Sequence, residues 1–339
     1  MKSFPYERLD PLLSEAQADR MVELCEAFGS YGMYSEEPVF EGFGAGLPAR
    51  YDAALHFVRT GGRFGRSEPP AVLAARTNYF RETYAYGDRV FLPGIEPLLR
   101  HEGLVEGARR IHGRPLVEPA IVYANLLVPG QELAVHTDVP EFRGANRKKH
   151  PQWLLVAMHH SGLFADWRMP IATAVAYFQD VRGGAFAFYP DGPDAPAYTV
   201  PVRRNTAVLL DTDSVFHGVD RVAEVPGDFP RLRPGMRLRY VGDRSWEVGP
   251  DEAPLARYGW DEIRFSVSWK AYCFRDEAER RAWREHTDDL SLEFVLDRLV
   301  DDLKRRGRID LRPSDAELPK VLIEEYIHFP RPAAEGAAG

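Results

Sequence analysis

The chain has 339 residues, of which 45% are hydrophobic and 28% are charged, and its formal net charge is -8 at pH 7. These proportions are ordinary for a globular protein, and the length allows one elaborated domain with a sizeable core. The acidic excess disfavours nucleic acid as a partner, because affinity for nucleic acid depends mainly on basic side chains. No apolar run suits a signal peptide or a membrane span of about 18 residues, so we expect a cytoplasmic protein without a membrane partner.

The N-terminal part of the chain, residues 1–118, is predicted to be a helical support region. Ser14 precedes apolar residues that recur near the helical period as far as Phe28, so an amphipathic helix with a serine cap is expected there. The other elements expected in this region are an irregular connection over 30–75 with a short helix near 49–58, a strand over 76–81 and an interrupted helix over 95–112.

From residue 117 the pattern changes to the alternating or continuously apolar runs that are typical of strands. The predicted strands cover residues 121–128, 131–139, 153–158, 171–178, 185–189, 198–202, 206–210 and 264–274. Eight such runs between residues 119 and 274, with helices on both sides, predict a mainly β protein with a double-stranded β-helix, or jelly-roll, core.

Two further segments complete the expected organisation. Residues 223–260 are rich in proline, glycine and charge, and they form an insertion that we expect to be a mobile cover over the active site, with a surface excursion as the alternative. Residues 275–330 should be helical, with helices over 276–306 and 319–326. We expect the support region, the core and these helices to form one structural domain.

Two histidines and an aspartate within the predicted core suggest a metal site. Side chains alternate between the two faces of a strand, so His136 and Asp138 project from the same face. His217 would add a second imidazole. Two histidines and one carboxylate on one side of a metal, with the opposite positions open, are typical of non-haem Fe(II) oxygenases. We therefore predict that His136, Asp138 and His217 are the metal ligands and the catalytic residues.

Two further histidines and the two cysteines of the chain are left out of this predicted metal site. His159 and His160 are adjacent, so in an extended chain their rings would point to opposite faces and would make poor joint ligands, and we leave them out of the metal site. Cys25 and Cys273 are too far apart to indicate a disulfide framework, and we expect two buried free thiols.

Several motifs occur in a characteristic order around the metal-binding residues. In chain order they are Tyr123 and Asn125, the His136-Thr-Asp138 pair, Gly183-Gly-Ala-Phe-Ala-Phe-Tyr-Pro190, His217, and Arg264-Phe-Ser266. This succession, over about residues 119–274, resembles the Fe(II)- and 2-oxoglutarate-dependent dioxygenases, in a form similar to their prolyl-hydroxylase-like and small-molecule hydroxylase branches.

The resemblance implies Fe(II), 2-oxoglutarate as cosubstrate, O2, and ascorbate as a potential stimulant. Arg264 would bind the distal carboxylate of 2-oxoglutarate with help from Ser266, and Tyr123 and Asn125 would be further cosubstrate contacts. The expected reaction is hydroxylation of a small molecule, such as an amino acid or a specialised metabolite, with release of succinate and CO2. Desaturation and cyclisation are related outcomes of the same chemistry.

Three alternatives stay open at this point. The long insertion before Arg264 departs from the family pattern, so Arg264 could instead pair with a structural acid such as Asp261 or Glu262. The protein could be a cupin-type metalloenzyme that does not use 2-oxoglutarate, or a non-enzymatic jelly roll that binds a ligand. The oligomeric state is not predicted.

Overall fold

A large antiparallel sheet forms the base of the molecule. The computed structural model describes residues 3–34, 51–223, 229–230, 232–233, 235–250 and 253–332, and within them this sheet has eleven strands. In spatial order they are β1 (Tyr6–Leu9), β12 (Thr206–Leu210), β9 (Ile171–Tyr177), β17 (Arg264–Phe274), β5 (Leu116–Leu127), β3 (Phe80–Tyr86), β2 (Ser30–Met33), β14 (Arg237–Tyr240), β15 (Ser245–Gly249) and β16 (Ala256–Gly259), with β4 (Arg89–Val90) paired to β3. β17 pairs with β5 along its whole length.

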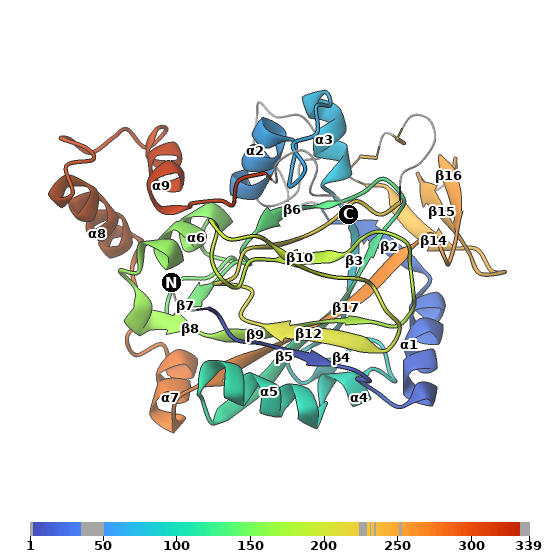
Figure 1. Ribbon diagram of the computed structural model, residues 1–339. Helices are drawn as coiled ribbons and strands as arrows, with labels where there is room; N and C mark the ends of the chain where they lie inside the picture. The colour runs from blue at the N-terminus through green and yellow to red at the C-terminus, as the bar shows by residue number, and fades with distance from the viewer. Residues whose placement is uncertain are drawn as a thin grey trace.

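A smaller sheet lies against the middle of the large one (Figure 1). Its strands are, in spatial order, β11 (Tyr198–Val200), β10 (Phe186–Phe188), β13 (His217–Val219) and β6 (Leu133–His136). An apolar cluster joins the two sheets, with Val175 and Tyr177 from β9 packed with Phe186 and Phe188 from β10. A short separate pair consists of β7 (Glu141–Phe142) and β8 (Arg168–Met169). Two facing antiparallel sheets confirm the predicted double-stranded β-helix core.

Three helices pack on the side of the large sheet away from the small one (Figure 1). They are α1 (Glu15–Phe28), α4 (Glu96–Leu99) and α5 (Glu102–His112). The cap of α1 is as predicted, because the Ser14 side chain accepts a hydrogen bond from the backbone of Gln17 while the Gln17 side chain accepts one from the backbone of Ser14. Met21 of α1 and Leu104 of α5 share an apolar core with Trp269 of β17. This helical layer supports one face of the large sheet, and the opposite face lines the candidate site described below.

The remaining helices lie around the small sheet and at one end of the molecule. They are α2 (Tyr51–Thr60), α3 (Pro70–Arg76), α6 (Gln152–Ser161), a 3-10 turn (Ala165–Trp167), α7 (Glu277–Glu285), α8 (Leu292–Arg305) and α9 (Leu318–Tyr326). α6, α8 and α9 share a second apolar core. No helix in the described part of the chain is both long and apolar enough to cross a membrane.

The strand predicted over residues 153–158 is wrong, because these residues form α6. Every residue from Leu154 to Met158 is buried. A helix buried on all sides and a strand buried on both faces have the same continuous apolar sequence, so periodicity could not separate them. The argument that excluded His159 and His160 as residues of an extended chain fails with it, since both lie in the last turn of α6.

Other boundaries also differ from the prediction. The helix expected over 276–306 is interrupted, because His286 adopts a left-handed conformation with φ 57° that ends α7. The strand expected over 76–81 begins only at Phe80, and the described residues of the N-terminal region form strands β1 to β4 as well as helices. The irregular connection expected over 30–75 falls partly outside the described residues, at 35–50. Cys25 and Cys273 are buried free thiols, as expected.

The described part of the insertion 223–260 extends the large sheet. Its strands β14, β15 and β16 continue the sheet from β2, and Trp246 of β15 is fully buried against Tyr31 and Trp260. None of the described residues of this insertion lines the cavity described below. The prediction that the insertion covers the active site is therefore wrong for these strands. Residues 224–228, 231, 234 and 251–252 of the insertion lie outside the described residues.

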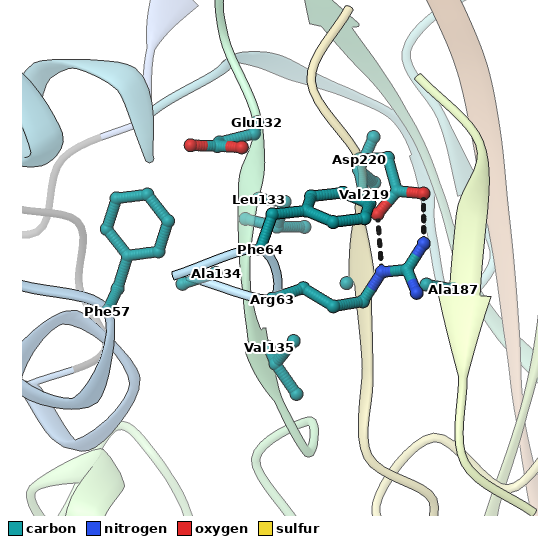
Figure 2. A pocket seen from close by; sticks show the side chains of 11 residues that line it. Phe57, Arg63, Phe64, Glu132, Leu133, Ala134, Val135, Ala187, Val219 and Asp220 are labelled. Atoms are coloured by element: carbon teal, nitrogen blue, oxygen red, sulfur yellow. Dashed lines mark hydrogen bonds and ion pairs between the residues drawn. The ribbon is translucent and has the colours of Figure 1, made fainter. Parts of the chain in front are cut away.

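The segment after α2 is attached to the outer face of the small sheet (Figure 2). The Arg63 guanidinium donates two hydrogen bonds to the Asp220 carboxylate, at 2.8 and 2.6 Å, and Phe64 lies beside this pair. Asp220 directly follows β13, and neighbouring Leu133 belongs to β6. The strands β6 and β13, which carry His136 and His217, are therefore in contact with the N-terminal region.

Candidate metal centre

His136, Asp138 and His217 converge between the two sheets. His136 ends β6 and lies opposite His217, the first residue of β13, with a distance of 4.3 Å between ring centroids. Asp138 follows the strand, and its backbone N–H donates to the Thr212 carbonyl at 2.7 Å. Its Oδ1 lies 3.5 Å from Nε2 of His136 and 3.8 Å from Nε2 of His217. The three candidate ligand atoms therefore point at one small space.

Both histidines have their tautomer fixed by the backbone. Nδ1 of His136 lies 2.7 Å from the Ala134 carbonyl, and Nδ1 of His217 lies 2.9 Å from the Val215 carbonyl. A carbonyl can only accept, so each Nδ1 carries a proton, and Nε2 is the atom that has the lone pair when the ring is neutral. Burial lowers the pKa of His217 to about 3, and the neighbouring His136 contributes to this lowering, so His217 is neutral at physiological pH. Neutral imidazoles of this orientation are ready to bind a metal.

The Asp138 carboxylate is kept ionised by a lysine. Burial alone would raise the pKa of Asp138, but the Lys270 ammonium and the histidines hold it well below its usual range. Lys270 donates to Oδ2 of Asp138 at 2.6 Å. Burial disfavours the charged lysine, yet Asp138 raises the pKa of Lys270 above its ordinary value. One carboxylate oxygen is thus occupied by Lys270, and the other faces the histidines.

Two neutral imidazoles and one carboxylate are a donor set that suits a divalent transition metal with open coordination positions. Within the described residues, this is the one group of three or more such side chains with converging ligand atoms. His159 and His160 lie elsewhere: Nε2 of His159 is 3.1 Å from the Ser214 hydroxyl, and Nε2 of His160 is 3.3 Å from the Thr137 hydroxyl.

Arg264 lies fully buried on β17, near the metal-binding residues. Its Nε donates to the Gly184 carbonyl at 2.8 Å, its Nη1 to the Ser266 hydroxyl at 3.0 Å and its Nη2 to the Tyr177 hydroxyl at 3.1 Å. No described carboxylate pairs with it, so the expected alternative of a structural ion pair with Asp261 or Glu262 does not form. Burial lowers the pKa of Arg264, although Tyr177 partly offsets this effect.

One cavity connects the three candidate metal ligands to Arg264. Tyr123 and Asn125 of β5 line it as well, so the structure brings all seven predicted site residues together. The complete lining is Tyr79, Tyr123, Asn125, Leu127, Leu133, His136, Asp138, Thr173, Val175, Phe186, Thr212, His217, Val219, Arg264, Ser266 and Ser268. A metal and a small anion could therefore be held side by side.

Sequence reasoning missed two residues that complete the site. Lys270 continues the two-residue alternation of Arg264, Ser266 and Ser268 along β17, so the pattern of the strand contained a signal for it. Tyr177 lies in a predicted strand, but its contact with Arg264 depends on the pairing of β9 with β17. Nothing in the local sequence of Tyr177 indicates that contact.

Several solved structures are similar to this chain at low sequence identity. The non-heme alpha-ketoglutarate-dependent epimerase SnoN from nogalamycin biosynthesis is 14% identical with a TM-score of 0.39, over 80% of this chain and 79% of that chain. A prolyl-4-hydroxylase from Pseudomonas putida is 10% identical with a TM-score of 0.38, over 80% and 92% of the two chains. HygX from Streptomyces hygroscopicus, with nickel and 2-oxoglutarate bound, is 11% identical with a TM-score of 0.38, over 80% and 84%.

With identities of 10–14% and TM-scores of 0.38–0.39, these likenesses carry no argument about the reaction of this chain. No protein-family model matches the chain, and no curated protein matches it by sequence. A shared fold does not by itself define a reaction, so we infer the function from the side chains of the site.

Proposed function

We propose that this protein is an Fe(II)- and 2-oxoglutarate-dependent oxygenase that hydroxylates a small molecule. The observation that carries the proposal is one cavity with two kinds of groups. His136, Asp138 and His217 offer a metal-binding set, and the fully buried Arg264 has no acidic partner among the described residues. A metal-bound cosubstrate with a distal carboxylate would satisfy both.

Iron held by these three residues would supply oxygen activation, in which 2-oxoglutarate becomes succinate and CO2 while one oxygen atom enters succinate and the other enters the substrate. The chain's own residues provide binding and orientation. The backbone contacts of His136 and His217 direct each Nε2 towards the metal position, and Lys270 occupies Oδ2 of Asp138 so that Oδ1 remains for the metal.

Arg264 would bind the distal carboxylate of 2-oxoglutarate. The guanidinium is fixed by Gly184 and Tyr177, and the Ser266 hydroxyl lies beside it as a further donor. A planar guanidinium matches a carboxylate with two parallel hydrogen bonds. Tyr123 and Asn125, on the neighbouring strand β5, are positioned to contact the same ligand from the cavity wall.

The buried arginine distinguishes this proposal from its two alternatives. A cupin-type metalloenzyme would need the metal-binding set but no cation for a cosubstrate, and a non-enzymatic jelly roll would need neither. Burying an uncompensated charge costs several kcal/mol even after relaxation, about the range that an anionic ligand can recover. Arg264 therefore favours a cosubstrate that carries a negative charge.

Hydroxylation is the reaction that we favour within this class. The resemblance implies that halogenating members of the superfamily carry a small residue in place of the metal-binding carboxylate, which frees a position for chloride. Here Asp138 is present, and its contacts with Lys270 and the Thr212 carbonyl fix it beside the histidines. Desaturation and cyclisation use the same donor set, so the product has to be identified by its mass.

Succinate formation is the direct test of the proposed reaction. The purified protein should release succinate only when Fe(II), 2-oxoglutarate and O2 are all supplied, slowly without substrate and faster with it. His217→Ala should lower the rate by more than the roughly 10- to 100-fold that loss of an outer-shell partner costs. His159→Ala, with its fold checked by circular dichroism, serves as the control and should keep activity. Iron-dependent turnover that survives His217→Ala would refute the proposal.

A further inference from the structure

Arg81 adds a third basic side chain to the cavity side of the large sheet. It lies on β3 directly opposite Asn125 of β5, which in turn lies opposite Ser266 of β17. Residues that face each other on adjacent strands project from the same side of a sheet, and Asn125 and Ser266 both line the cavity. Arg81 is therefore on the same side as Arg264 and Lys270, but two strands away from them.

Three tyrosines surround the Arg81 guanidinium. Its central carbon lies 3.6 Å from the ring centroid of Tyr123 and 4.9 Å from that of Tyr34. Tyr34 is itself stacked on Tyr79, with 5.1 Å between ring centroids. Stacking on aromatic faces stabilises a guanidinium, and the in-plane N–H donors that are not hydrogen-bonded to Tyr79 can bind another group. Tyr79 and Tyr123 both line the cavity, so these rings place Arg81 next to it, although Arg81 itself is not among the lining residues.

No acidic side chain in the described part of the chain forms an ion pair with Arg81, whose contacts are with tyrosines. Other arginines nearby are paired, as Arg76 and Arg221 are with Glu68. A second polar group at the cavity also lacks a partner, because Oδ1 of Asn125 is buried without a hydrogen bond. Both observations indicate that a polar ligand completes this part of the cavity.

We propose that Arg81 binds a carboxylate of the primary substrate, which makes the substrate a small organic acid. This inference depends on the proposed function, in which the cosubstrate occupies Arg264 and leaves Arg81 for a second acid. The remainder of the substrate should be apolar, because Leu127 and Val219 form a buried apolar cluster with Tyr79 and Leu133 at the same cavity. An acid with a short hydrocarbon body fits both features.

Calorimetric binding to the protein loaded with Ni(II) and saturating 2-oxoglutarate tests this inference without turnover. The probes are 3-phenylpropanoate, 4-methylpentanoate and N-acetyl-leucine, each compared with its own carboxamide. At least one acid should bind about tenfold or more tightly than its amide, as expected for a hydrogen-bonded charge pair. Arg81→Gln should abolish that preference. Arg298→Gln is the matched control, because Arg298 also lies over two aromatic rings, but Phe164 and Phe294 do not line the cavity, whereas Tyr123 beside Arg81 does.

A separate titration with 2-oxoglutarate alone distinguishes failure of the proposed function from failure of the proposed role of Arg81. Ni(II)-loaded wild type and Arg81→Gln should bind 2-oxoglutarate within about twofold of each other, a difference of under 1 kcal/mol. Failure of the wild type to bind 2-oxoglutarate would overturn the proposed function. Normal 2-oxoglutarate binding without any preference for acids over amides would overturn only the role of Arg81. Weaker 2-oxoglutarate binding by Arg81→Gln would make Arg81 a cosubstrate residue and would also refute the inference.

Discussion

Lys270 Nζ lies 2.6 Å from Oδ2 of Asp138, while Oδ1 of the same carboxylate faces the two imidazoles at 3.5 and 3.8 Å. The two oxygens of one side chain are thus divided between a protein cation and the metal position. The ammonium of Lys270 and the carboxylate of Asp138 are both mostly buried. Removing one member of such a pair leaves an uncompensated charge, which costs more than the pair contributes. In the proposed function, Lys270 is therefore a positioning residue for the Asp138 carboxylate.

Lys270→Met should lower the unfolding free energy of the metal-free protein by about 2–4 kcal/mol, because Asp138 loses its partner. Saturating Mn(II) should recover much of this loss, since the metal supplies the positive charge that the lysine provided. The increase in Tm on adding Mn(II) should thus be larger in the variant than in the wild type. Thermal unfolding of the wild type and of Lys270→Met, each with and without Mn(II), measures these Tm values.

The control for this variant is Lys149→Met. Lys149 is about half exposed and lies 3.7 Å from Asp289, so its loss should change stability by no more than about 0.5 kcal/mol. Equal destabilisation of Lys270→Met with and without Mn(II) would show that Lys270 acts through packing and not through the charge of Asp138.

Gly184→Ala should weaken 2-oxoglutarate binding by about tenfold or more while leaving metal binding intact, because it displaces the arginine and not the histidines. A Cβ at position 184 would lie 2.7 Å from Cδ of Arg264, and the Gly184 carbonyl is the acceptor for its Nε. Calorimetry of 2-oxoglutarate with Mn(II)-loaded protein gives the affinity.

The matched control for this substitution is Gly162→Ala. Gly162 has φ +70°, close to the +63° of Gly184, but a Cβ there would meet no atom within 4 Å. Both variants share the cost of a left-handed alanine, about 1 kcal/mol, and only Gly184→Ala adds the collision with Arg264. An equal loss of 2-oxoglutarate affinity in the two variants would remove Arg264 as the explanation.

His56 should make the stability of the protein sensitive to acid. It stacks on Phe329 with 4.4 Å between ring centroids, and burial lowers its pKa from 6.5 to about 4. A histidine whose pKa is lower in the folded state stabilises the fold above about pH 6.5, and this contribution is lost as pH falls towards 4. The wild type should lose about 1–2 kcal/mol more than His56→Phe over that range, after allowance for partial exposure. Urea unfolding of both proteins at pH 7 and pH 4.5 measures this difference. An equal loss of unfolding free energy in the wild type and in His56→Phe would contradict this role.

The sequence was sufficient for the strand β17 because one face of it is apolar and the other is mostly polar. β17 has the predicted bounds, since Phe265, Val267 and Trp269 alternate with polar residues along the strand. The same alternation reaches Lys270, which could have been found by following it two residues further. The helix α6 could not be distinguished from a strand, because its apolar run from Leu154 to Met158 is buried throughout.

Contacts between distant strands were beyond the reach of sequence patterns. Tyr177 has no local signal for its role, and its partner Arg264 lies 87 residues away through the pairing of β9 with β17. The position of Arg81 beside Tyr123 likewise depends on the register of β3 with β5. The order of motifs indicated the candidate residues, whereas the register of the sheet determines which of them meet.

The central claim is that the metal-binding residues and Arg264 hold 2-oxoglutarate together. Calorimetric titration of 2-oxoglutarate into Mn(II)-loaded protein without O2 tests it most directly, with wild type, Arg264→Lys and His217→Ala compared after their folds are checked. The wild type should bind one 2-oxoglutarate per chain, Arg264→Lys should bind it about tenfold or more weakly because lysine cannot form two parallel hydrogen bonds, and His217→Ala should not bind it. Wild-type affinity in Arg264→Lys, or binding that does not need the metal, would contradict the account.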